Sequence, residues 1–459
     1  MITKQEIMDF AREFSLEAKT IEKDYVLGWL LAGIETNSEL LDNWIFKGGT
    51  CLKKCYFETY RFSEDLDYTL TDVKHIDENF LKTNFKQVTA WISDMVGIQI
   101  PDFRFEIYKN NAGKVSAEGS IYYIGPLQRR GSIARIKLDL TADEVLVLPK
   151  AMREVHHPYS DKPQNGIKAN CYSFPEIFGE KIRALSERAR PRDLYDVIHL
   201  YRHADPSFKP EIVLDVLKKK CEYKKISLPT MESLETHSKL HELQSEWENM
   251  LAHQLPGLPS RDQFWNELPE LFKWLYGETT KVVLSPMPLK ESIDRLWKPP
   301  SMIRAWGAKV PLELIRYAAA NHLCIDLSYV NTKRLIEPYD LIKTKDGNLI
   351  VVAIKHKTGE HRSYRVDRIQ GIEVTSQGFV PKYVISMTPF SEAVSTIRPV
   401  IKKINRTHKI NKPFDHVYYI QCTVCGKKFR RRNYSTKINP HKNQNGLPCF
   451  GRIGNRVNG

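Results

Sequence analysis

A proline-rich segment at residues 279–301 most constrains how this chain can fold. Its prolines are Pro286, Pro288, Pro299 and Pro300. Proline lacks a backbone N–H and fixes φ, so we expect neither a regular helix nor a central strand to run through this segment. The chain has 459 residues, more than one core of the usual ~100 to 200 residues accommodates. We predict a linker at 279–301 and separate folded units on either side of it.

The positive charge of the chain is concentrated at its C-terminus. The formal net charge is +14, and between Ile401 and Gly459 the sequence has 14 Lys or Arg residues against one acidic residue, Asp415. The preceding 400 residues are therefore nearly neutral. A basic end on a neutral body indicates binding to a polyanion such as nucleic acid, and the alternative is a solubilising tail.

Composition favours a soluble, cytoplasmic protein. The sequence is 42% hydrophobic and 27% charged, which is typical of globular domains. Residues 1–10 lack a secretory pattern and the apolar stretch Tyr25–Ile34 is too short to cross a bilayer, so we expect no membrane association. Five cysteines are scattered without a disulfide-like spacing, as expected in a reducing compartment. These are Cys51, Cys55, Cys171, Cys221 and Cys324.

A glycine pair follows a short apolar stretch, Trp44–Phe46. The residues Lys47-Gly48-Gly49-Thr50 lead into a helix-like segment that starts at Cys51. Exposed backbone N–H groups in such a turn can hold phosphate. Alone, the signal is weak, because glycine pairs mostly serve turns.

Three aspartates are predicted to share the polar faces of two strands. Asp65 and Asp67 alternate along the strand-like segment 65–70, and Asp139 lies in a second such segment, 133–141. Alternation sends the side chains of each segment's polar residues to one face. Hard carboxylate oxygens on paired strands suit two Mg²⁺ ions, because Mg²⁺ keeps coordination places for substrate phosphates. A solvated sheet face is the alternative interpretation.

Several motifs together resemble a known family of enzymes. The segments are Ile21-Glu22-Lys23-Asp24-Tyr25, Phe46 to Leu70 including Arg61-Phe62-Ser63-Glu64-Asp65-Leu66-Asp67, Lys137-Leu138-Asp139, Gly179-Glu180-Lys181-Ile182-Arg183-Ala184-Leu185 and Arg190-Pro191-Arg192-Asp193-Leu194-Tyr195-Asp196. In this order they resemble the AbiEii and MenA type of nucleotidyltransferase toxin. The resemblance covers roughly residues 1–278.

This resemblance implies a fold and an activity. The fold would be α+β, with a polymerase-beta-like nucleotidyltransferase core and a helical tail that we expect to be helical throughout residues 205–278. Some members of the family transfer a nucleotide from an NTP to the acceptor end of tRNA and so block translation. The same resemblance implies growth inhibition or phage defence, and a cognate antitoxin as a partner.

The resemblance also implies roles for individual residues. Asp65, Asp67 and Asp139 would bind two catalytic Mg²⁺ ions, Lys181 would offset charge as pyrophosphate leaves, and Asp193 would support the catalytic centre. The residues expected to bind the nucleotide are Lys47, Gly48, Gly49, Thr50, Arg61 and Ser63. Taken singly, Lys181 fits a surface lysine and Asp193 fits a residue that favours a helix N-terminus.

The C-terminal segment carries a predicted zinc site. Cys422, Cys425, His441 and Cys449 have the spacing C-x₂-C-x₁₅-H-x₇-C, and three thiolates with one imidazole complete a closed, structural Zn²⁺ site. A unit of residues 401–459 is too small to build a sufficient core without such a staple. His408 or His416 could replace His441. Basic and aromatic residues around the site suit phosphate contacts and base stacking, which favours RNA or DNA as a partner. They are Arg430, Arg431, Arg432, Lys437, Lys442, Tyr418, Tyr419, Phe429, Tyr434 and Phe450.

Residues 302–400 contain a strand-rich region with a predicted hairpin turn at Asp346-Gly347. The segments Arg334–Tyr339 and Tyr364–Ile369 resemble the WYL domain, a small β-barrel that senses nucleic acid or nucleotides in bacterial defence regulators. The Trp-Tyr-Leu signature itself is missing, since Asn348, Leu349 and Ile350 stand in its place. A plain structural barrel or open sheet is the alternative.

The leading hypothesis is a nucleotidyltransferase that moves a nucleotide from an NTP to RNA, with tRNA as the expected acceptor. Two other hypotheses remain. One is a non-catalytic nucleic-acid-binding regulator with a degenerate nucleotidyltransferase domain, which the intact acids oppose. The other is an enzyme that nucleotidylates a protein or a small molecule, which only the identity of the acceptor distinguishes.

Overall fold

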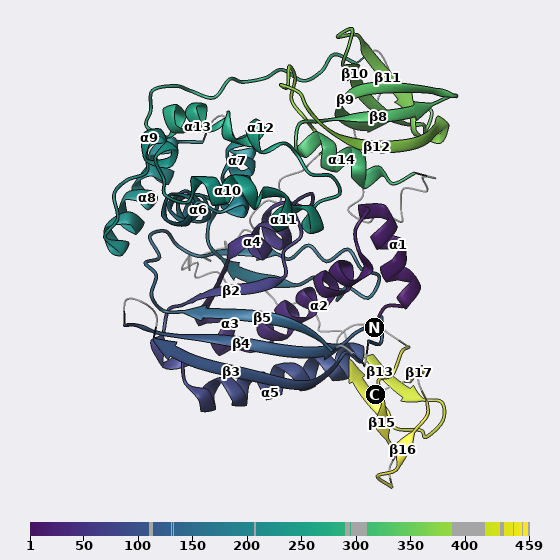
Figure 1. Cartoon of the computed structure of the whole chain (residues 1–459). Coiled ribbons are helices and arrows are strands. Elements are labelled where there is room, and N and C mark those ends of the chain that lie inside the picture. The colour runs from purple at the N-terminus through teal and green to yellow at the C-terminus, as the bar shows by residue number, and fades with distance from the viewer. Residues whose placement is uncertain are drawn as a thin grey trace, which may run out of the picture. The chain divides into compact units, whose positions relative to one another are not determined.

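The computed structural model describes residues 1–459 except 110–112, 130, 132, 206–207, 290–293, 295–309, 388–417, 432–435, 444, 452 and 458–459. The chain divides into two compact units, residues 1–396 and 397–459. The first unit contains a large mixed sheet, a helical lobe and a smaller antiparallel sheet (Figure 1).

A seven-stranded mixed sheet forms the N-terminal part of the first unit, in the order β3-β4-β5-β2-β1-β7-β6. Its strands are β1 (Trp44–Lys47), β2 (Asp65–Leu70), β3 (Gln99–Lys109), β4 (Val115–Ile124), β5 (Ala134–Thr141), β6 (Ala151–Glu154) and β7 (Lys168–Cys171). Strands β2 and β5 are parallel neighbours, although the two lie far apart in the sequence. The parallel pairing brings the two aspartate-bearing segments together at the centre of the sheet.

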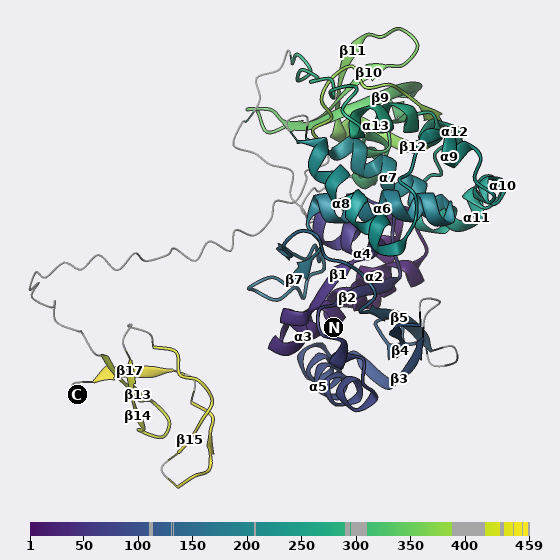
Figure 2. The same ribbon diagram turned by 90° about the vertical axis from the view of Figure 1, so that its left-hand side faces the viewer.

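Helices cover one face of this sheet. The helices of this part of the chain are α1 (Lys4–Phe14), α2 (Ala18–Glu35), α3 (Ser38–Asn43), α4 (Gly48–Cys51) and α5 (Glu78–Val96). A π-helical turn (Leu52–Tyr56) and a 3₁₀ turn (Val73–His75) lie between them in the sequence. The ring of Phe85 on α5 packs edge-on against Phe105 of β3, and Phe105 and Leu138 both lie against Gly119 of β4. Helix α5 therefore covers the face on which Leu138 lies. Figures 1 and 2 show α5 beside β3. Asp139 points to the opposite face because side chains alternate along a strand.

A lobe of helices follows the sheet. It contains α6 (Phe174–Arg188), α7 (Pro191–His203), α8 (Pro210–Lys224), α9 (Met231–Glu235), α10 (Leu240–Ser245), α11 (Trp247–Leu251), a 3₁₀ turn (Ala252–Gln254), α12 (Arg261–Trp265) and α13 (Leu268–Leu275). Proline occupies the first turn of α6, α7, α8 and α13, where its missing N–H costs no hydrogen bond.

The expectation that residues 205–278 are helical throughout is wrong in detail. Helix α8 ends at Lys224, and residues 226–230 and 255–260 are not helical. Pro229, Pro256 and Pro259 lie in these two gaps, and proline disfavours helical continuation on its N-terminal side. The apolar residues of this lobe nevertheless form one core with the sheet.

The smaller sheet begins after a helix, α14 (Leu312–Ala320). Its strands are β8 (Leu323–Tyr329), β9 (Thr332–Lys343), β10 (Leu349–Lys355), β11 (His361–Arg365) and β12 (Ile369–Gly378), in the antiparallel order β11-β10-β9-β8-β12, with a 3₁₀ turn at Val366–Arg368. The predicted hairpin turn is confirmed between β9 and β10, where Gly347 has a φ of +84°. Helix α14 packs against β8, β9 and β12 (Figure 1).

The second unit is a small β structure. It has a three-stranded sheet in the order β14-β13-β17 and a two-stranded sheet of β15 and β16. The strands are β13 (Tyr418–Cys422), β14 (Lys428–Arg431), β15 (His441–Lys442), β16 (Pro448–Cys449) and β17 (Gly454–Val457), drawn in yellow in Figures 1 and 2. Its apolar core is small, as expected for a unit that needs a metal staple: Ile420, Ile438 and the two cysteines Cys422 and Cys449.

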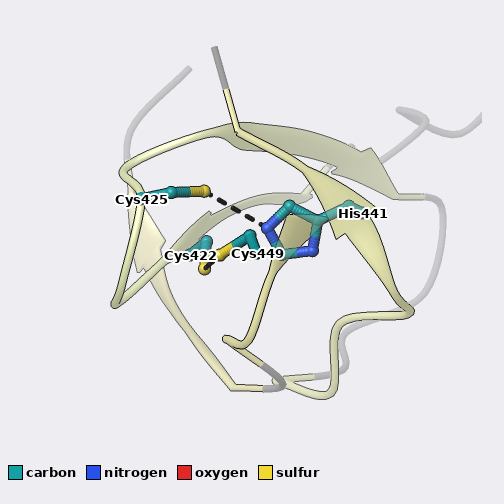
Figure 3. Close-up of side chains that lie close together, drawn as sticks. All are labelled: Cys422, Cys425, His441 and Cys449. Atoms are coloured by element: carbon teal, nitrogen blue, oxygen red, sulfur yellow. Dashed lines mark hydrogen bonds between the residues drawn. The ribbon is translucent and has the colours of Figure 1, made fainter. Parts of the chain in front are cut away.

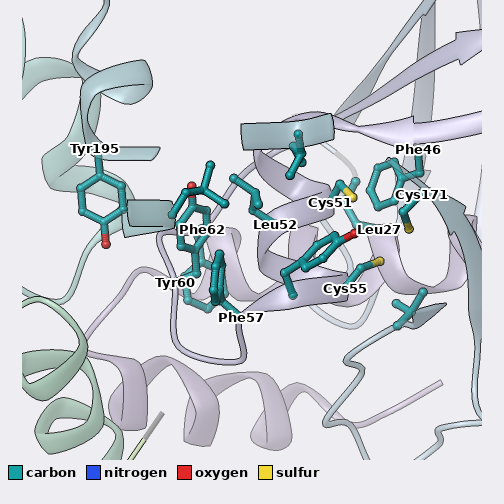
Figure 4. Packing of buried hydrophobic residues seen from close by; sticks show 14 of the residues in the cluster. Leu27, Phe46, Cys51, Leu52, Cys55, Phe57, Tyr60, Phe62, Cys171 and Tyr195 are labelled. Atoms are coloured by element: carbon teal, nitrogen blue, oxygen red, sulfur yellow. The ribbon is translucent and has the colours of Figure 1, made fainter. Parts of the chain in front are cut away.

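Three of the scattered cysteines meet in the core of the first unit. Cys51, Cys55 and Cys171 are all buried as free thiols, and their sulfurs lie within 4.8 Å of one another (Figure 4). They pack among apolar side chains that include Phe46 and Leu27. Their separation in the sequence gave no sign of this cluster. No helix in the described parts of the chain is long and apolar enough to cross a membrane.

Candidate active site

The three predicted aspartates converge on the open face of the large sheet. Asp67 of β2 and Asp139 of β5 are direct neighbours in the parallel register. Asp65 lies two residues before Asp67, so its side chain emerges on the same face. All three side chains are partly exposed, whereas Leu66 and Leu138 between them are buried. The residues are thus placed as the alternating pattern predicts.

The electrostatics of this face favour a bound cation. Burial and the neighbouring charge of Asp67 raise the pKa of Asp139 to about 6. Burial and Asp67 also raise the pKa of Asp65 above its ordinary value. Carboxylates that face one another at this spacing repel, and a divalent cation among them would relieve the repulsion. Hard oxygen donors make the site suitable for Mg²⁺ rather than for a soft metal.

The glycine pair sits directly against this face. Gly48 has a φ of +79°, and a Cβ atom there would lie 2.0 Å from Oδ2 of Asp67. A Cβ atom on Gly49 would lie 2.5 Å from Nη2 of Arg61 and 3.0 Å from Oγ of Ser63. Both positions therefore require glycine, one for its conformation and both for close approach. The turn brings its backbone next to the predicted metal ligand Asp67.

Neighbouring residues hold the glycine turn in place. The hydroxyl of Thr50 donates to the carbonyl of Asp65 at 2.5 Å, which ties the start of α4 to β2. Lys47 pairs with Asp67 in the antiparallel β1–β2 register, and its Nζ lies 3.8 Å from Glu144 Oε1. The predicted nucleotide-binding residues thus surround one strand end.

A second group of candidate site residues surrounds the carboxylate of Asp196. It is fully buried on α7 and accepts from Arg61 Nε at 2.7 Å, Arg61 Nη2 at 2.8 Å and the hydroxyl of Tyr60. Nζ of Lys181 lies 2.7 Å from its Oδ2. Burial opposes ionisation, but the charges of Arg61 and Lys181 hold the pKa of Asp196 below its ordinary value. Asp196 therefore fixes the positions of two predicted site residues.

Asp193 lies one helical turn from Asp196 and also faces Lys181. Its Oδ1 is 3.8 Å from Lys181 Nζ, and both of its oxygens accept from Arg188, at 2.6 and 2.7 Å. Asp193 is 1% exposed, whereas the side chain of Arg188 is 44% exposed. The structure thus places Asp193 behind a half-exposed arginine that comes from the end of α6.

Sequence reasoning did not assign site roles to Asp196, Arg188 or Glu144. Asp196 stands three residues after Asp193, so both carboxylates emerge on the same face of α7. This three-residue spacing could have identified Asp196 as a second site residue from the sequence. Arg188 and Glu144 carried none, because only the tertiary fold brings Glu144 near Lys47 and near Nη2 of Arg183, at 3.7 Å.

The second unit brings the four predicted zinc ligands together. One ligand atom from each of Cys422, Cys425, His441 and Cys449 lies within 4.8 Å of all the others (Figure 3). Tetrahedral zinc binds thiolates at about 2.3 Å, which sets bound sulfurs about 3.8 Å apart. Sγ of Cys422 and Sγ of Cys449 are 3.8 Å apart, and Cys425 Sγ lies 3.2 Å from His441 Nε2. The donor set and its spacing fit a closed zinc site.

Some of the residues predicted around the zinc site can be placed, and the two alternative histidines cannot. His408 and His416 lie outside the described residues, as do Arg432 and Tyr434. The ring of Phe429 packs edge-on against His441, with ring centres 5.0 Å apart. Phe450, which follows the predicted ligand Cys449 in the sequence, is by contrast 87% exposed.

Aspartates on neighbouring strands, a glycine turn against them and a lysine held by helix carboxylates form the arrangement that the sequence predicts for a nucleotidyltransferase. Residues 29–276 match the family model described as "Nucleotidyl transferase AbiEii toxin, Type IV TA system". This match covers more than half of the chain, so the chain belongs to the AbiEii family of nucleotidyltransferase toxins. Residues 311–374 match the model of the WYL domain. The resemblance and the fold class inferred from the sequence are both confirmed.

Solved structures of two bacterial proteins are similar to part of the chain. One is MenT4, a nucleotidyltransferase toxin from Mycobacterium tuberculosis H37Rv, with 16% identity, coverage of 60% of this chain and 90% of that chain, and a TM-score of 0.43. The other is JHP933 from Helicobacter pylori, with 17% identity, coverage of 57% and 99%, and a TM-score of 0.29. A search of curated proteins gives no match. The family assignment rests on the family match.

Proposed function

We propose that this protein transfers a nucleotide from an NTP to the 3′ end of an RNA, with the acceptor end of tRNA as the substrate, by a mechanism that uses two Mg²⁺ ions. The observation that carries the proposal is the placement of Asp65, Asp67 and Asp139 on one sheet face against the glycine turn. Two Mg²⁺ ions bound there would neutralise triphosphate charge and activate the attacking hydroxyl.

The residues of the chain then have distinct tasks. The backbone N–H groups of Gly48 and Gly49, with the hydroxyl of Ser63, would hold nucleotide phosphates. Thr50 would serve nucleotide binding by fixing the turn, because its hydroxyl donates to the carbonyl of Asp65. Lys47 would add positive charge at the same strand end. These contacts would align the α-phosphate with the RNA hydroxyl, and alignment lowers the barrier to transfer.

The two cations beside Asp196, Lys181 and Arg61, would have different tasks. We assign Lys181 to the charge that develops on pyrophosphate, because Asp196 and Asp193 hold its ammonium next to the site. Arg61 serves nucleotide binding by supporting Gly49, since Asp196 and Gln254 already engage its guanidinium.

We assign RNA binding to the C-terminal unit, residues 401–459. No acidic residue follows Asp415 in the sequence, and Val424, Leu447 and Phe450 are 67%, 63% and 87% exposed. Cationic side chains bind phosphates and exposed aromatic rings stack on unpaired bases, so this composition supports a single-stranded RNA end as the partner. The zinc ion would hold the short strands that present these residues.

The biological setting follows from the family. We propose that transfer inhibits growth by blocking translation, that a cognate antitoxin restrains the enzyme, that it acts in the cytoplasm and that it serves phage defence. The proposed division of labour is a nucleotidyltransferase domain with its helical tail at 1–278, a linker at 279–301, the WYL-like domain at 302–400 and the zinc unit at 401–459.

The test is incubation of the full-length protein with Mg²⁺, each α-labelled NTP in turn and total bacterial RNA, followed by a denaturing gel. We expect label on a tRNA-sized band and its loss in Asp67→Asn. The matched control is Glu106→Gln, an acid on the exposed edge strand β3, which should retain transfer. Label that persists in Asp67→Asn would overturn the mechanism. Label on protein alone would identify a protein acceptor, and no label at all would favour a binding regulator.

A further inference from the structure

Helix α14, which precedes the smaller sheet, docks on the nucleotidyltransferase lobe through buried polar contacts. Asn321, at the end of α14, is completely buried and its Oδ1 accepts from the hydroxyl of Tyr195 at 2.8 Å. Its Nδ2 donates to the carbonyl of Tyr317 at 3.0 Å, which fixes the orientation of the amide. Gln263 Nε2 donates to the backbone carbonyl of Asn321 at 3.1 Å. These contacts join two parts of the chain that the proline-rich segment separates.

Tyr195 connects this contact to the candidate active site. It lies on α7 directly before Asp196, the carboxylate that holds Lys181 and Arg61. The Tyr195 ring is fully buried and its centre lies 5.7 Å from that of Tyr60; Figure 4 labels both rings. The hydroxyl of Tyr60 also donates to Asp196. A change at the Tyr195 hydroxyl therefore acts on the residue that precedes Asp196 in the helix and that packs against Tyr60, a hydrogen-bond partner of Asp196.

A second contact from the same helix reaches the loop that carries Arg61. Arg316 is 4% exposed, and its Nη2 donates to Oε2 of Glu58 at 2.9 Å. Its Nε donates to the carbonyl of Met387 at 3.1 Å, and its Nη1 donates to Glu313 at 2.6 Å. Glu58 stands three residues before Arg61. Helix α14 thus holds both the helix that carries Asp196 and the loop that carries its partner Arg61.

Buried polar contacts of this kind specify one arrangement. Removing one partner leaves the other group buried without a hydrogen bond, which is more costly than removing a solvated contact. Two domains joined only by a flexible linker would not need such contacts, because their surfaces could remain hydrated.

We propose that Asn321 is a positioning residue for nucleotidyl transfer: through Tyr195 it sets the position of Asp196 and so of Lys181 and Arg61. The WYL-matched region, which contains Asn321 and Arg316, thereby supports the catalytic lobe directly. A change in that region that moved α14 would alter transfer without touching the three aspartates. This inference rests on the proposed nucleotidyl transfer.

The experiment compares Asn321→Ala, Tyr195→Phe and their double variant in the full-length protein. The matched control is Tyr317→Phe, which removes a hydroxyl of the same helix that donates to the carbonyl of Gly257. We expect the first two variants to lower kcat roughly 10- to 100-fold, because misplacement of Lys181 acts on the transition state, and to raise KM for the NTP by a smaller factor through Arg61. The double variant should resemble the single ones, since all remove one shared contact. The control should keep kcat within about 2-fold.

A structural readout separates this inference from the proposed function. Hydrogen exchange should increase in residues 191–203 and 57–64 of Asn321→Ala and not of Tyr317→Phe, whether or not the RNA assay succeeds. Unchanged kcat and exchange in Asn321→Ala and Tyr195→Phe would overturn the inference. So would an equal loss in Tyr317→Phe, which would mean simple domain docking. An inactive wild-type protein with the expected exchange pattern would overturn only the proposed transfer.

Discussion

At the scale of single residues, the site requires glycine at two positions where neighbouring side chains leave no room for a Cβ atom. Gly48 and Gly49 leave the space that Asp67, Arg61 and Ser63 occupy. The sequence identified these glycines and aspartates as one motif, but the aspartates follow the glycines by more than a dozen residues. Their contact arises because β1 and β2 pair side by side.

Gly48→Ala should abolish transfer. The added Cβ would meet the Asp67 carboxylate, and the positive φ strains any L side chain by about 1 kcal/mol. Gly97→Ala is the control, because Gly97 has a similar φ of +73° with no atom within 4 Å of its Cβ position. Both variants should lose stability in thermal unfolding through the positive φ, Gly48→Ala the more so because its Cβ also meets Asp67, and only Gly48→Ala should lose activity. Comparable activity in the two variants would show that the close approach to Asp67 is unimportant.

Asp139→Asn should stabilise the metal-free fold at pH 7 while it removes transfer. The pKa of Asp139 is raised to about 6 by burial and Asp67, so the folded protein binds its proton more tightly than the unfolded chain does. The carboxyl therefore costs stability as pH rises from about 4 to 6, and the cost persists above that range. Discounted for solvent screening, we expect a gain of about 1 kcal/mol in Asp139→Asn.

Chemical denaturation in EDTA at pH 7 and at pH 4 measures this effect. The difference between Asp139→Asn and wild type should shrink at the lower pH, where wild-type Asp139 is protonated. Mg²⁺ should stabilise the wild type more than the variant, because the variant lacks one ligand. A variant that is less stable than wild type at pH 7 would contradict the prediction.

At the scale of secondary structure, the local sequence pattern predicted a strand correctly where one face of the strand is buried and the other is partly exposed. Strand β5 has buried Ile136, Leu138 and Leu140 alternating with partly exposed Lys137 and Asp139, as predicted from the sequence. The helical lobe was harder, because apolar spacing persists across residues 205–278 while prolines divide the chain into short helices. Periodicity reports which residues are buried, and it does not report where a helix ends.

At the scale of the whole molecule, the chain combines one large unit with a small one whose four clustered ligands are predicted to bind zinc. The described part of residues 1–396 has one large core and a smaller apolar cluster around the smaller sheet, whereas the described part of residues 397–459 buries few apolar residues. A small unit gains most of its folding free energy from a bound zinc ion. The two units should therefore lose their structure under different conditions.

Cys425→Ser should abolish zinc binding and unfold the second unit alone. We expect one zinc per wild-type chain, none in the variant, and weaker RNA binding by the variant. The main thermal transition should stay unchanged, because Cys425 lies outside the large core. Elemental analysis, RNA titration and calorimetry measure the three quantities. Cys221→Ala, which alters a buried cysteine of α8, should retain its zinc; equal zinc content in Cys425→Ser would contradict the assigned site.

The sequence by itself determined the features that depend on short spacing. These are the paired aspartates, the glycine turn, the Cys422 and Cys425 pair of the predicted zinc site and the hairpin at Gly347, and each follows from the geometry of a few consecutive residues. Tertiary structure alone decided which distant segments meet. It placed Asp196 between Lys181 and Arg61, brought Cys51 and Cys55 to Cys171, and set Asn321 against Tyr195. Such contacts come from packing between helices and strands that are distant in the sequence, and no local residue pattern predicts them.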